Sequence, residues 1–256
     1  MAGGYSTIYS TILRWTWTSI SRVLTSAASA AGRSDPPGPG PADLIISLGL
    51  FTVGLGVKSA MFPVHIWLPD AHTYAPSSSS AMLSALVLKA YIILFIKIVF
   101  RLYGIDIVNS MPVLDIVLVT GAAGMIYGSI MAILQKDLKR MIAYSSVAQI
   151  GYIFFGMGLG NFLGFVAAVF HIISHALTKS ALFLIAGNII HQTHSKEIGS
   201  LKGIGIEMPV TMGVFIAGAL SMVGIPLFIG FNSKWNFALA IIDSNKILFI
   251  AVLVAS

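Results

Sequence analysis

Residues 162–190 have the sequence FLGFVAAVFHIISHALTKSALFLIAGNII, an apolar run without Asp or Glu. A helix needs about 20 apolar residues to cross a bilayer. The run is long enough, and Lys179 is its one lysine or arginine. It therefore predicts a transmembrane helix.

Three polar residues lie at regular spacing in this run. His171, His175 and Lys179 are at i, i+4 and i+8, so they share one side of the helix. A polar stripe in a membrane span faces a partner helix or water. Because histidine exchanges protons near neutral pH, we interpret the stripe as a proton relay, with His171 as an accessory member.

Two other interpretations of the stripe stay open. His171 and His175 have the spacing of two zinc ligands, but the run His171-Ile172-Ile173-Ser174-His175 lacks the glutamate of a metalloprotease helix. We therefore expect no metal site. The stripe could also be a polar seam that only packs helices.

The rest of the chain supports a membrane protein. It has 256 residues, of which 57% are hydrophobic and 9% charged, against about 25% charged in soluble domains. We expect an all-α integral membrane bundle. Further spans are predicted at about 43–61, 79–102, 112–134, 140–159 and 209–226, and a seventh apolar run begins at Ile247.

The composition also excludes some chemistry. There is no cysteine, so this chain forms no disulfide, zinc–thiolate site or Fe–S cluster. We expect no cofactor and no redox chemistry in it. The net charge of +6 lies largely in short loops and at helix ends, where it sets orientation and does not require nucleic acid.

Prolines predict two broken helices. Pro63 ends the first span before a short helical piece at 64–72, and Pro226 ends the sixth before a piece at 232–243. Lys58 precedes the first break and Lys234 follows the second. Broken helices at membrane depth line cavities and ion sites in transporters, so both lysines are candidates for proton transfer. For Lys58, snorkelling to the interface is the alternative.

Lys89 lies near the middle of the predicted span at 79–102. A lysine at that depth raises the free energy of insertion by about 2.5–3.5 kcal/mol, which favours a function in moving protons. Lys97 and Arg101 follow on a similar face. Lys97 is an accessory candidate, with snorkelling as the alternative.

Residues 1–42 differ from the rest, since they are rich in Ser, Thr and Ala and end in a Pro/Gly run. A transit-like segment, a span around 8–24 and an ill-defined terminus are all open for them. We divide the chain into this N-terminal segment and a transmembrane domain at 43–256, which we expect to be a fragment.

Loop charge predicts the orientation. The loop at 136–140 contributes Lys136, Lys139 and Arg140, and the loop at 191–207 contributes Lys196 and Lys202. The opposite loops contribute two basic residues. This bias places the 136–140 and 191–207 loops on the cytoplasmic side.

Glycine clusters such as Gly156-Met157-Gly158-Leu159-Gly160 lie in or at the ends of apolar runs and lack the strand–turn–helix context of a nucleotide loop. We expect them to allow close helix packing.

Several motifs resemble antiporter-like membrane subunits: the family that contains the D-type subunit of Mrp cation/proton antiporters and the proton-pumping subunits of complex I and membrane-bound hydrogenases. The motifs are Val57-Lys58-Ser59-Ala60-Met61-Phe62-Pro63-Val64-His65-Ile66-Trp67-Leu68-Pro69-Asp70-Ala71-His72, Leu88-Lys89-Ala90-Tyr91, Asp137-Leu138-Lys139-Arg140-Met141-Ile142-Ala143-Tyr144-Ser145-Ser146 and His175-Ala176-Leu177-Thr178-Lys179-Ser180. The resemblance covers about 43–245 and is nearest to the D-type branch of the Mrp antiporters.

This resemblance implies two inverted five-helix repeats, each with a broken helix, and a midplane line of buried lysines and histidines. Lys58, Lys89, Lys179 and Lys234 fall at positions that the family uses for proton transfer, and His175 extends the line. The chain departs from the family in lacking a buried glutamate before Lys58.

The implied function is proton translocation, with or without coupled Na⁺, in a multisubunit cation/proton antiporter of the inner cell membrane. The implied partners are other membrane subunits. One alternative is a proton-pumping subunit of an NADH:quinone oxidoreductase or a membrane-bound hydrogenase. Another is a fragment that does not transport.

Overall fold

The structure is a computed structural model that describes residues 40–255, so the expectations for a transit-like segment or a span around 8–24 lie outside the described residues. The elements are α2 (Pro41–Ser59), α3 (Trp67–Tyr74), α4 (Ser77–Met82), η1 (Leu83–Val87), α5 (Leu88–Lys97), η2 (Ile98–Tyr103), α6 (Ile105–Asn109), α7 (Val113–Ile133), α8 (Leu138–Gly158), α9 (Phe162–Thr193), η3 (Ile198–Leu201), α10 (Ile204–Glu207), α11 (Pro209–Val223), α12 (Ile229–Asp243), η4 (Ile247–Phe249) and α13 (Ile250–Ala255).

The predicted all-α membrane bundle is confirmed. Five helical stretches are long and apolar enough to cross a membrane: 42–59, 77–103, 113–133, 138–158 and 162–193. Each begins and ends within a few residues of the predicted run. In lipid every backbone group must be satisfied inside the helix, so an apolar run of this length fixes the element.

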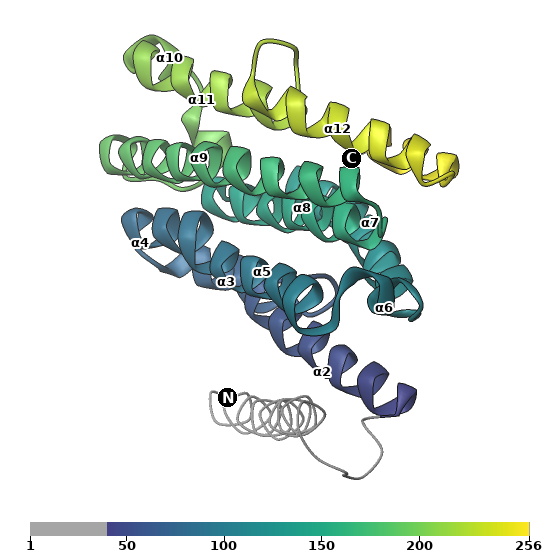
Figure 1. Cartoon of the computed structure of the whole chain (residues 1–256). Coiled ribbons are helices and arrows are strands. Elements are labelled where there is room, and N and C mark those ends of the chain that lie inside the picture. Colours follow the sequence, from purple (N-terminus) through teal and green to yellow (C-terminus); the bar gives the residue numbers. More distant parts are fainter. Residues whose placement is uncertain (1–39, 256) are drawn as a thin grey trace, which may run out of the picture.

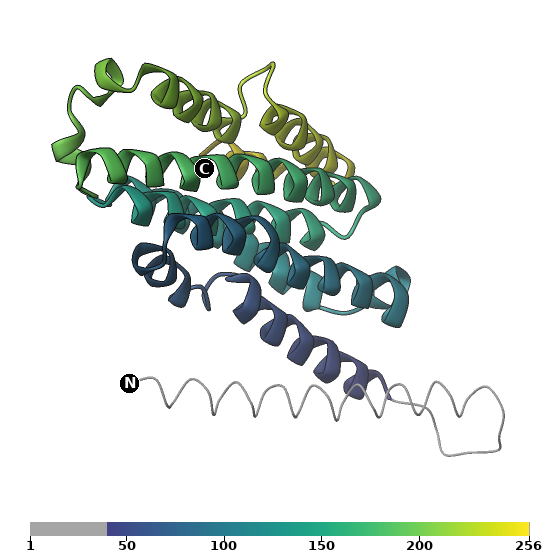
Figure 2. The ribbon, with the colours of Figure 1, turned by 90° about the vertical axis from the view of Figure 1, so that its left-hand side faces the viewer.

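The long helices are roughly parallel (Figure 1), with α7, α8 and α9 between the α2–α5 group and the α11–α12 pair. In the turned view of Figure 2 the same order holds, and a loop separates α11 from α12. Helix α8 is the centre of the bundle, because 89% of the residues in its most apolar 18-residue stretch are buried.

Glycines bring α7 and α8 into close contact, as expected from the glycine clusters. A Cβ on Gly158 would lie 2.4 Å from the backbone nitrogen of Leu118, and one on Gly128 would lie 2.4 Å from that of Ala148. Both distances are shorter than any real Cβ contact. Only glycine therefore allows these two helices to approach so closely.

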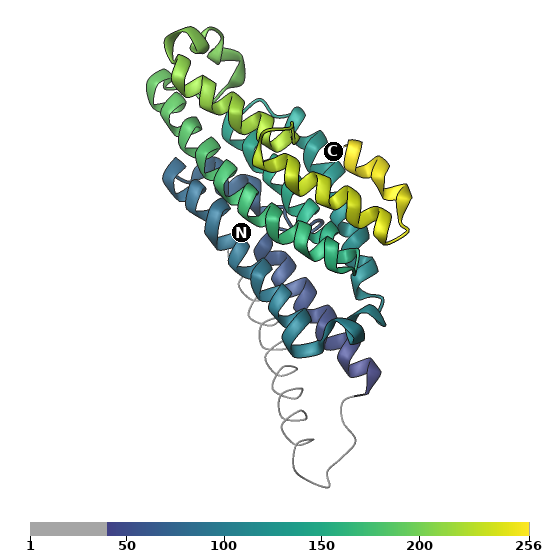
Figure 3. The same ribbon diagram turned by 45° about the horizontal axis from the view of Figure 1, so that its top comes forward.

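Both predicted helix breaks are present. Helix α2 ends at Ser59, Ala60 adopts a left-handed conformation, and the chain resumes as α3 at Trp67. The indole Nε1 of Trp67 donates a hydrogen bond to the carbonyl oxygen of Val57 in the last turn of α2, at 2.8 Å. Figure 3 shows the second break, where α11 and α12 follow one another beside α9.

The two basic loops lie at the same end of the bundle. Asp137 and Glu197 form an isolated antiparallel bridge, and Leu138 and Ile198 donate backbone hydrogen bonds across it. At the other end, Asn161 donates to the carboxylate of Asp243 at 2.7 Å. The predicted pairing of the loops is therefore correct, although it does not identify the compartment.

Candidate functional site

Lys179 is fully buried in the middle of α9. Its Nζ donates to the carbonyl oxygen of Ile142 at 2.9 Å and to the Oγ of Ser145 at 2.5 Å, both on α8. Ser145 donates its own hydrogen to the same Ile142 oxygen, at 2.9 Å. Because both partners of Lys179 accept, α8 holds its amine as a hydrogen-bond donor.

Lys89 lies in the first turn of α5, the helix that follows a π-helical turn, η1. It is 3% exposed, and its Nζ donates to the carbonyl oxygen of Ser84 in that turn. A π turn leaves a backbone carbonyl without its usual partner, and such turns are frequent at functional sites. The Oγ of Ser84 is buried without a partner in the described structure.

His175 lies one turn before Lys179 on α9. Its ring is 2% exposed, and neither nitrogen has a hydrogen-bond partner among residues 40–255. Its electrostatic neighbours are Lys89, Lys179, His171 and His72. A buried imidazole without direct partners is the kind of group that internal water satisfies.

His171 extends the cluster toward α12. Its ring stacks on that of His175 with centroids 6.2 Å apart, and its Nδ1 lies 2.9 Å from the Oγ of Ser233. The rings of Tyr152 and Phe237 flank it at 5.3 and 5.5 Å. The three predicted residues of α9 thus face one polar interior, and α12 contributes to it.

The lysines beside the two breaks lie at the margins. Lys234 is half-buried, with its Nζ 4.7 Å above the ring of Tyr152, which also contacts His171. Lys58 is half-buried, with its Nζ 5.9 Å from the ring of Tyr91 on α5. Lys97 is exposed. The structure therefore brings together Lys89, His171, His175 and Lys179, with Lys234 beside them.

The structure corrects the assignment of Lys139 and Arg140 to a loop, because α8 begins at Leu138 and both lie in its first turn. Lys139 is 4% exposed and donates its Nζ to the carbonyl oxygen of Ala75 at the end of α3. A sequence pattern locates the start of a helix only to within a few residues. It therefore cannot tell a charged residue in a loop from one in the first helical turn.

His72 is a buried residue that the sequence pattern does not predict for the site. It is fully buried in α3, outside the five candidate spans, and its ring stacks on Phe183 with centroids 4.4 Å apart. Burial, together with the charges of Lys179, Lys139 and Lys89, lowers the pKa of His72 to about 3. The imidazole is therefore neutral at physiological pH, at the edge of the lysine cluster.

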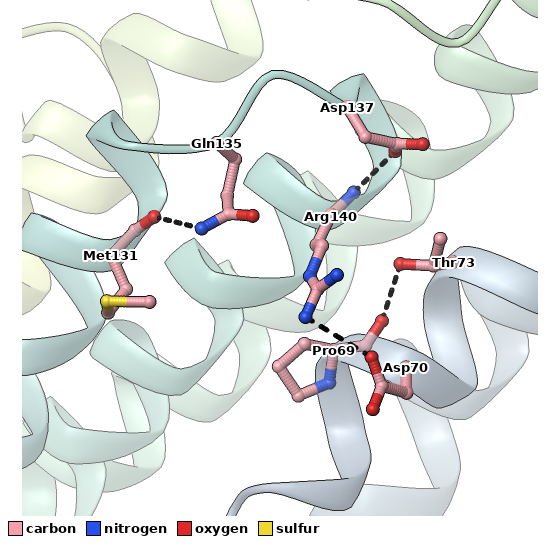
Figure 4. Close-up of polar contacts among 7 residues, drawn as sticks. All are labelled: Pro69, Asp70, Thr73, Met131, Gln135, Asp137 and Arg140. Carbon is pink, nitrogen blue, oxygen red and sulfur yellow. Dashed lines mark hydrogen bonds and ion pairs between the residues drawn. The ribbon is translucent and has the colours of Figure 1, made fainter.

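An ion pair fixes α3 to α8 at the basic end. Figure 4 shows the guanidinium of Arg140 beside the carboxylate of Asp70, with 3.4 Å between Nη2 and Oδ1. The carboxylate of Asp137 caps α8 by accepting a hydrogen bond from the backbone N–H of Arg140, at 3.0 Å. This anchor and the Lys139 contact hold His72 against α9.

No carboxylate of the described residues enters the cluster. None of the Asp and Glu side chains in residues 40–255 is buried. In the same residues, no three His, Cys, Asp or Glu side chains are grouped so that they could hold a metal ion. The cluster contains amines, imidazoles and hydroxyls, which are groups that transfer protons.

Residues 22–256 match the family described as NADH:quinone oxidoreductase/Mrp antiporter, TM. The chain belongs to this family. It is 43% identical over 213 residues to NADH-quinone oxidoreductase subunit N of Desulforudis audaxviator, which covers 83% of the chain and 42% of that protein. It is 35% identical over 203 residues to NADH-quinone oxidoreductase subunit M of Rickettsia prowazekii, covering 78% and 40%.

Chains of solved membrane complexes are similar to this chain over nearly its whole length. The archaeal membrane-bound sulfane sulfur reductase has a TM-score of 0.81 at 27% identity, covering 98% of this chain and 53% of that one. The Mrp complex of a Dietzia species has a TM-score of 0.76 at 26% identity, covering 97% and 47%. The chain thus spans about two fifths of the curated relatives and half of these structures.

Proposed function

We propose that this chain translocates protons through Lys89, Lys179 and His175, with His171, Lys58 and Lys234 continuing the path toward the two helix breaks. The observation that carries the proposal is the buried group of Lys89, Lys179, His175 and His171, which has no carboxylate of residues 40–255 beside it. Lys97, which is exposed, stays an accessory candidate.

Electrostatic repulsion between the protonated side chains drives the proton from one residue to the next. Several cations cannot be held close together away from water, because a low dielectric strengthens their repulsion. A proton that arrives on one member therefore favours release from its neighbour. His175 and Lys179 are one helical turn apart, so each senses the charge of the other.

Water completes the path. The unpartnered nitrogens of His175 and His72 and the hydroxyl of Ser84 are buried polar atoms that need bridging partners. A short water chain between such atoms moves protons without large motions of the side chains. Lys139 and His72 mark its end at the basic loops.

The second proposal concerns the complex in which this chain works. The similar structures are multisubunit membrane complexes by their descriptions, so we propose that this chain works with other membrane subunits. A cation/proton antiporter, with or without Na⁺, is our first choice. A complex I-like pump is favoured by the names of the curated relatives. Purification of the native complex decides: flavin and Fe–S proteins beside this chain indicate the pump.

We also propose a domain division and an orientation. Residues 43–256 form the transmembrane domain, and residues 1–42 are a separate N-terminal segment. The multi-pass chain lies in the inner membrane, with the 136–140 and 191–207 loops in the cytoplasm. The support for this side is their excess of basic residues.

The test of the proposed function is proton flux in liposomes that contain the whole parent complex. Lys89→Ala should abolish flux while the complex still assembles. Lys89→Arg should also fail, because arginine does not release its proton in this range. Lys202→Ala, an exposed loop lysine, is the matched control. Normal flux in the Lys89→Ala complex would contradict the proposal, and absent flux in the wild type would indicate a chain that does not transport.

A further inference from the structure

Ser233 joins the second broken helix to His171 of α9. It lies in α12, directly before Lys234, and is 1% exposed. Its Oγ is 2.9 Å from the Nδ1 of His171 and 2.9 Å from the carbonyl oxygen of Gly230 one turn earlier. Both contacts are within normal hydrogen-bond distance.

The number of hydrogens available assigns these bonds. A serine hydroxyl has one hydrogen and two acceptor lone pairs, whereas a carbonyl oxygen can only accept. The hydrogen of Ser233 therefore points to Gly230, and its oxygen accepts from His171. That bond requires a hydrogen on the Nδ1 of His171.

The other nitrogen of His171 is then the free one. A neutral imidazole has one N–H, so its Nε2 keeps a lone pair. This atom is buried and has no hydrogen-bond partner among residues 40–255. The flanking rings of Tyr152 and Phe237 hold the imidazole plane, so rotation about the side-chain bonds is restricted.

We infer that Ser233 is a positioning residue that keeps His171 as the Nδ1–H tautomer and so leaves Nε2 as the atom that accepts a proton. The inference rests on the proposed function and names the acceptor atom in it. Because Ser233 belongs to α12, a shift of this helix relative to α9 would break its hydrogen bond with His171, and the tautomer would no longer be fixed. The second break thereby acts on the proton path.

Charged and titratable groups face His171 from several elements. They are Lys234 from α12, Lys89 from α5, His175 from α9 and Tyr152 from α8. None of them contacts Nδ1 or Nε2 by a direct hydrogen bond. Ser233 is therefore the one direct hydrogen-bond partner of the ring in the described part of the chain.

The experiment is ¹⁵N NMR of histidine in the purified parent complex in lipid, with His171 assigned by the signal lost in His171→Gln. Protonated and unprotonated ring nitrogens have well-separated ¹⁵N shifts, so the tautomer is read directly. Wild type should show an unprotonated Nε2 at neutral pH. Ser233→Ala should change the tautomer ratio roughly fivefold, the effect of one neutral hydrogen bond, and should lower proton flux.

Two further variants complete the test. Ser233→Thr keeps the hydroxyl and should keep the wild-type tautomer. Ser180→Ala removes a hydroxyl of α9 that donates to the carbonyl oxygen of Ala176, and should change neither signal nor flux. A wild-type His171 that carries its hydrogen on Nε2 overturns the inference without any variant.

The inference is also wrong if Ser233→Ala keeps the wild-type tautomer, even where flux falls, because packing would then explain the loss. Absent flux in wild type would instead contradict the proposed function and leave the NMR result valid. The two failures are therefore distinguishable.

Discussion

The Nζ of Lys179 on α9 lies 2.5 Å from the Oγ of Ser145 on α8, and this hydroxyl is the one side-chain acceptor that the described structure gives the lysine. The other acceptor is the Ile142 carbonyl. Helices α8 and α9 are thus joined at the proposed path by a bond that involves the transferring group itself.

Replacement of this hydroxyl is the first prediction. Ser145→Ala removes one of two acceptors of a buried amine, which should weaken the protonated state of Lys179 by about 1.5–3 kcal/mol. Proton flux should fall at least several-fold while assembly is kept. Ser180→Ala is the control, because the Ser180 hydroxyl donates to the carbonyl oxygen of Ala176 within α9 and contacts neither acceptor of Lys179. Equal flux in both variants would show that Ser145 does not hold Lys179.

Much of the fold could be predicted because each membrane helix satisfies its own backbone. The run at 162–190 became α9, and prolines 63 and 226 lie in the breaks that they predict. The line of α9 residues was also predictable, since helical spacing alone places His171, His175 and Lys179 on one side.

The rest of the site depends on contacts between distant segments. Lys139 is buried because the end of α3, 64 residues earlier, supplies a carbonyl oxygen. His72 is buried because Phe183 of α9 covers its ring. No local pattern contains either contact. The available signals for His72 were its place in a short helix beside a proline break and at the end of the motif at 57–72.

The second prediction concerns orientation. The chain has no cysteine, so single cysteines can replace the exposed residues Lys136 and Asp106. With Lys139 buried, the basic end still has four other basic residues, Lys136, Arg140, Lys196 and Lys202, against Arg101 and Lys246 at the other end. A membrane-impermeant maleimide should therefore label position 136 from the cytoplasmic side and position 106 from the opposite side. Labelling of both from one side would refute this topology.

The third prediction concerns the second break. A Cβ on Gly230 would lie 1.7 Å from the carbonyl oxygen of Ser221, so Gly230→Ala forces α11 and α12 apart. The variant should lower the unfolding temperature in detergent and reduce proton flux. Gly213→Ala is the matched control on α11, where nothing lies within 4 Å. It should be neutral or gain up to about 1 kcal/mol from helix propensity. Equal unfolding temperatures in the two variants would exclude close packing at Gly230.

The fourth prediction uses the pKa of His72. The folded pKa of about 3 is below the unfolded value of 6.5, so the unfolded chain binds more protons between these pH values. The contribution of His72 to the free energy of unfolding is therefore fully present above pH 6.5 and falls as the pH decreases toward 3. His72→Phe keeps a ring against Phe183. Between pH 8 and pH 5 its free energy of unfolding should fall by about 2 kcal/mol less than that of the wild type. His191→Phe, at an exposed site, is the control. Parallel losses in all three proteins, measured by thermal unfolding, would place His72 outside this effect.

The last prediction is that His175 and Lys179 act as one relay unit. They lie one turn apart on α9, both are buried, and they interact electrostatically with no carboxylate of the described residues between them. Protonation of one therefore opposes protonation of the other, and neither transfers protons well alone. His175→Ala and Lys179→Ala should each reduce flux about as much as the double variant, because residues that act as a unit are not additive. Losses that simply multiply would mean that the two residues work independently. A harmless His175→Ala would leave Lys179 on the path and make the histidine a packing residue.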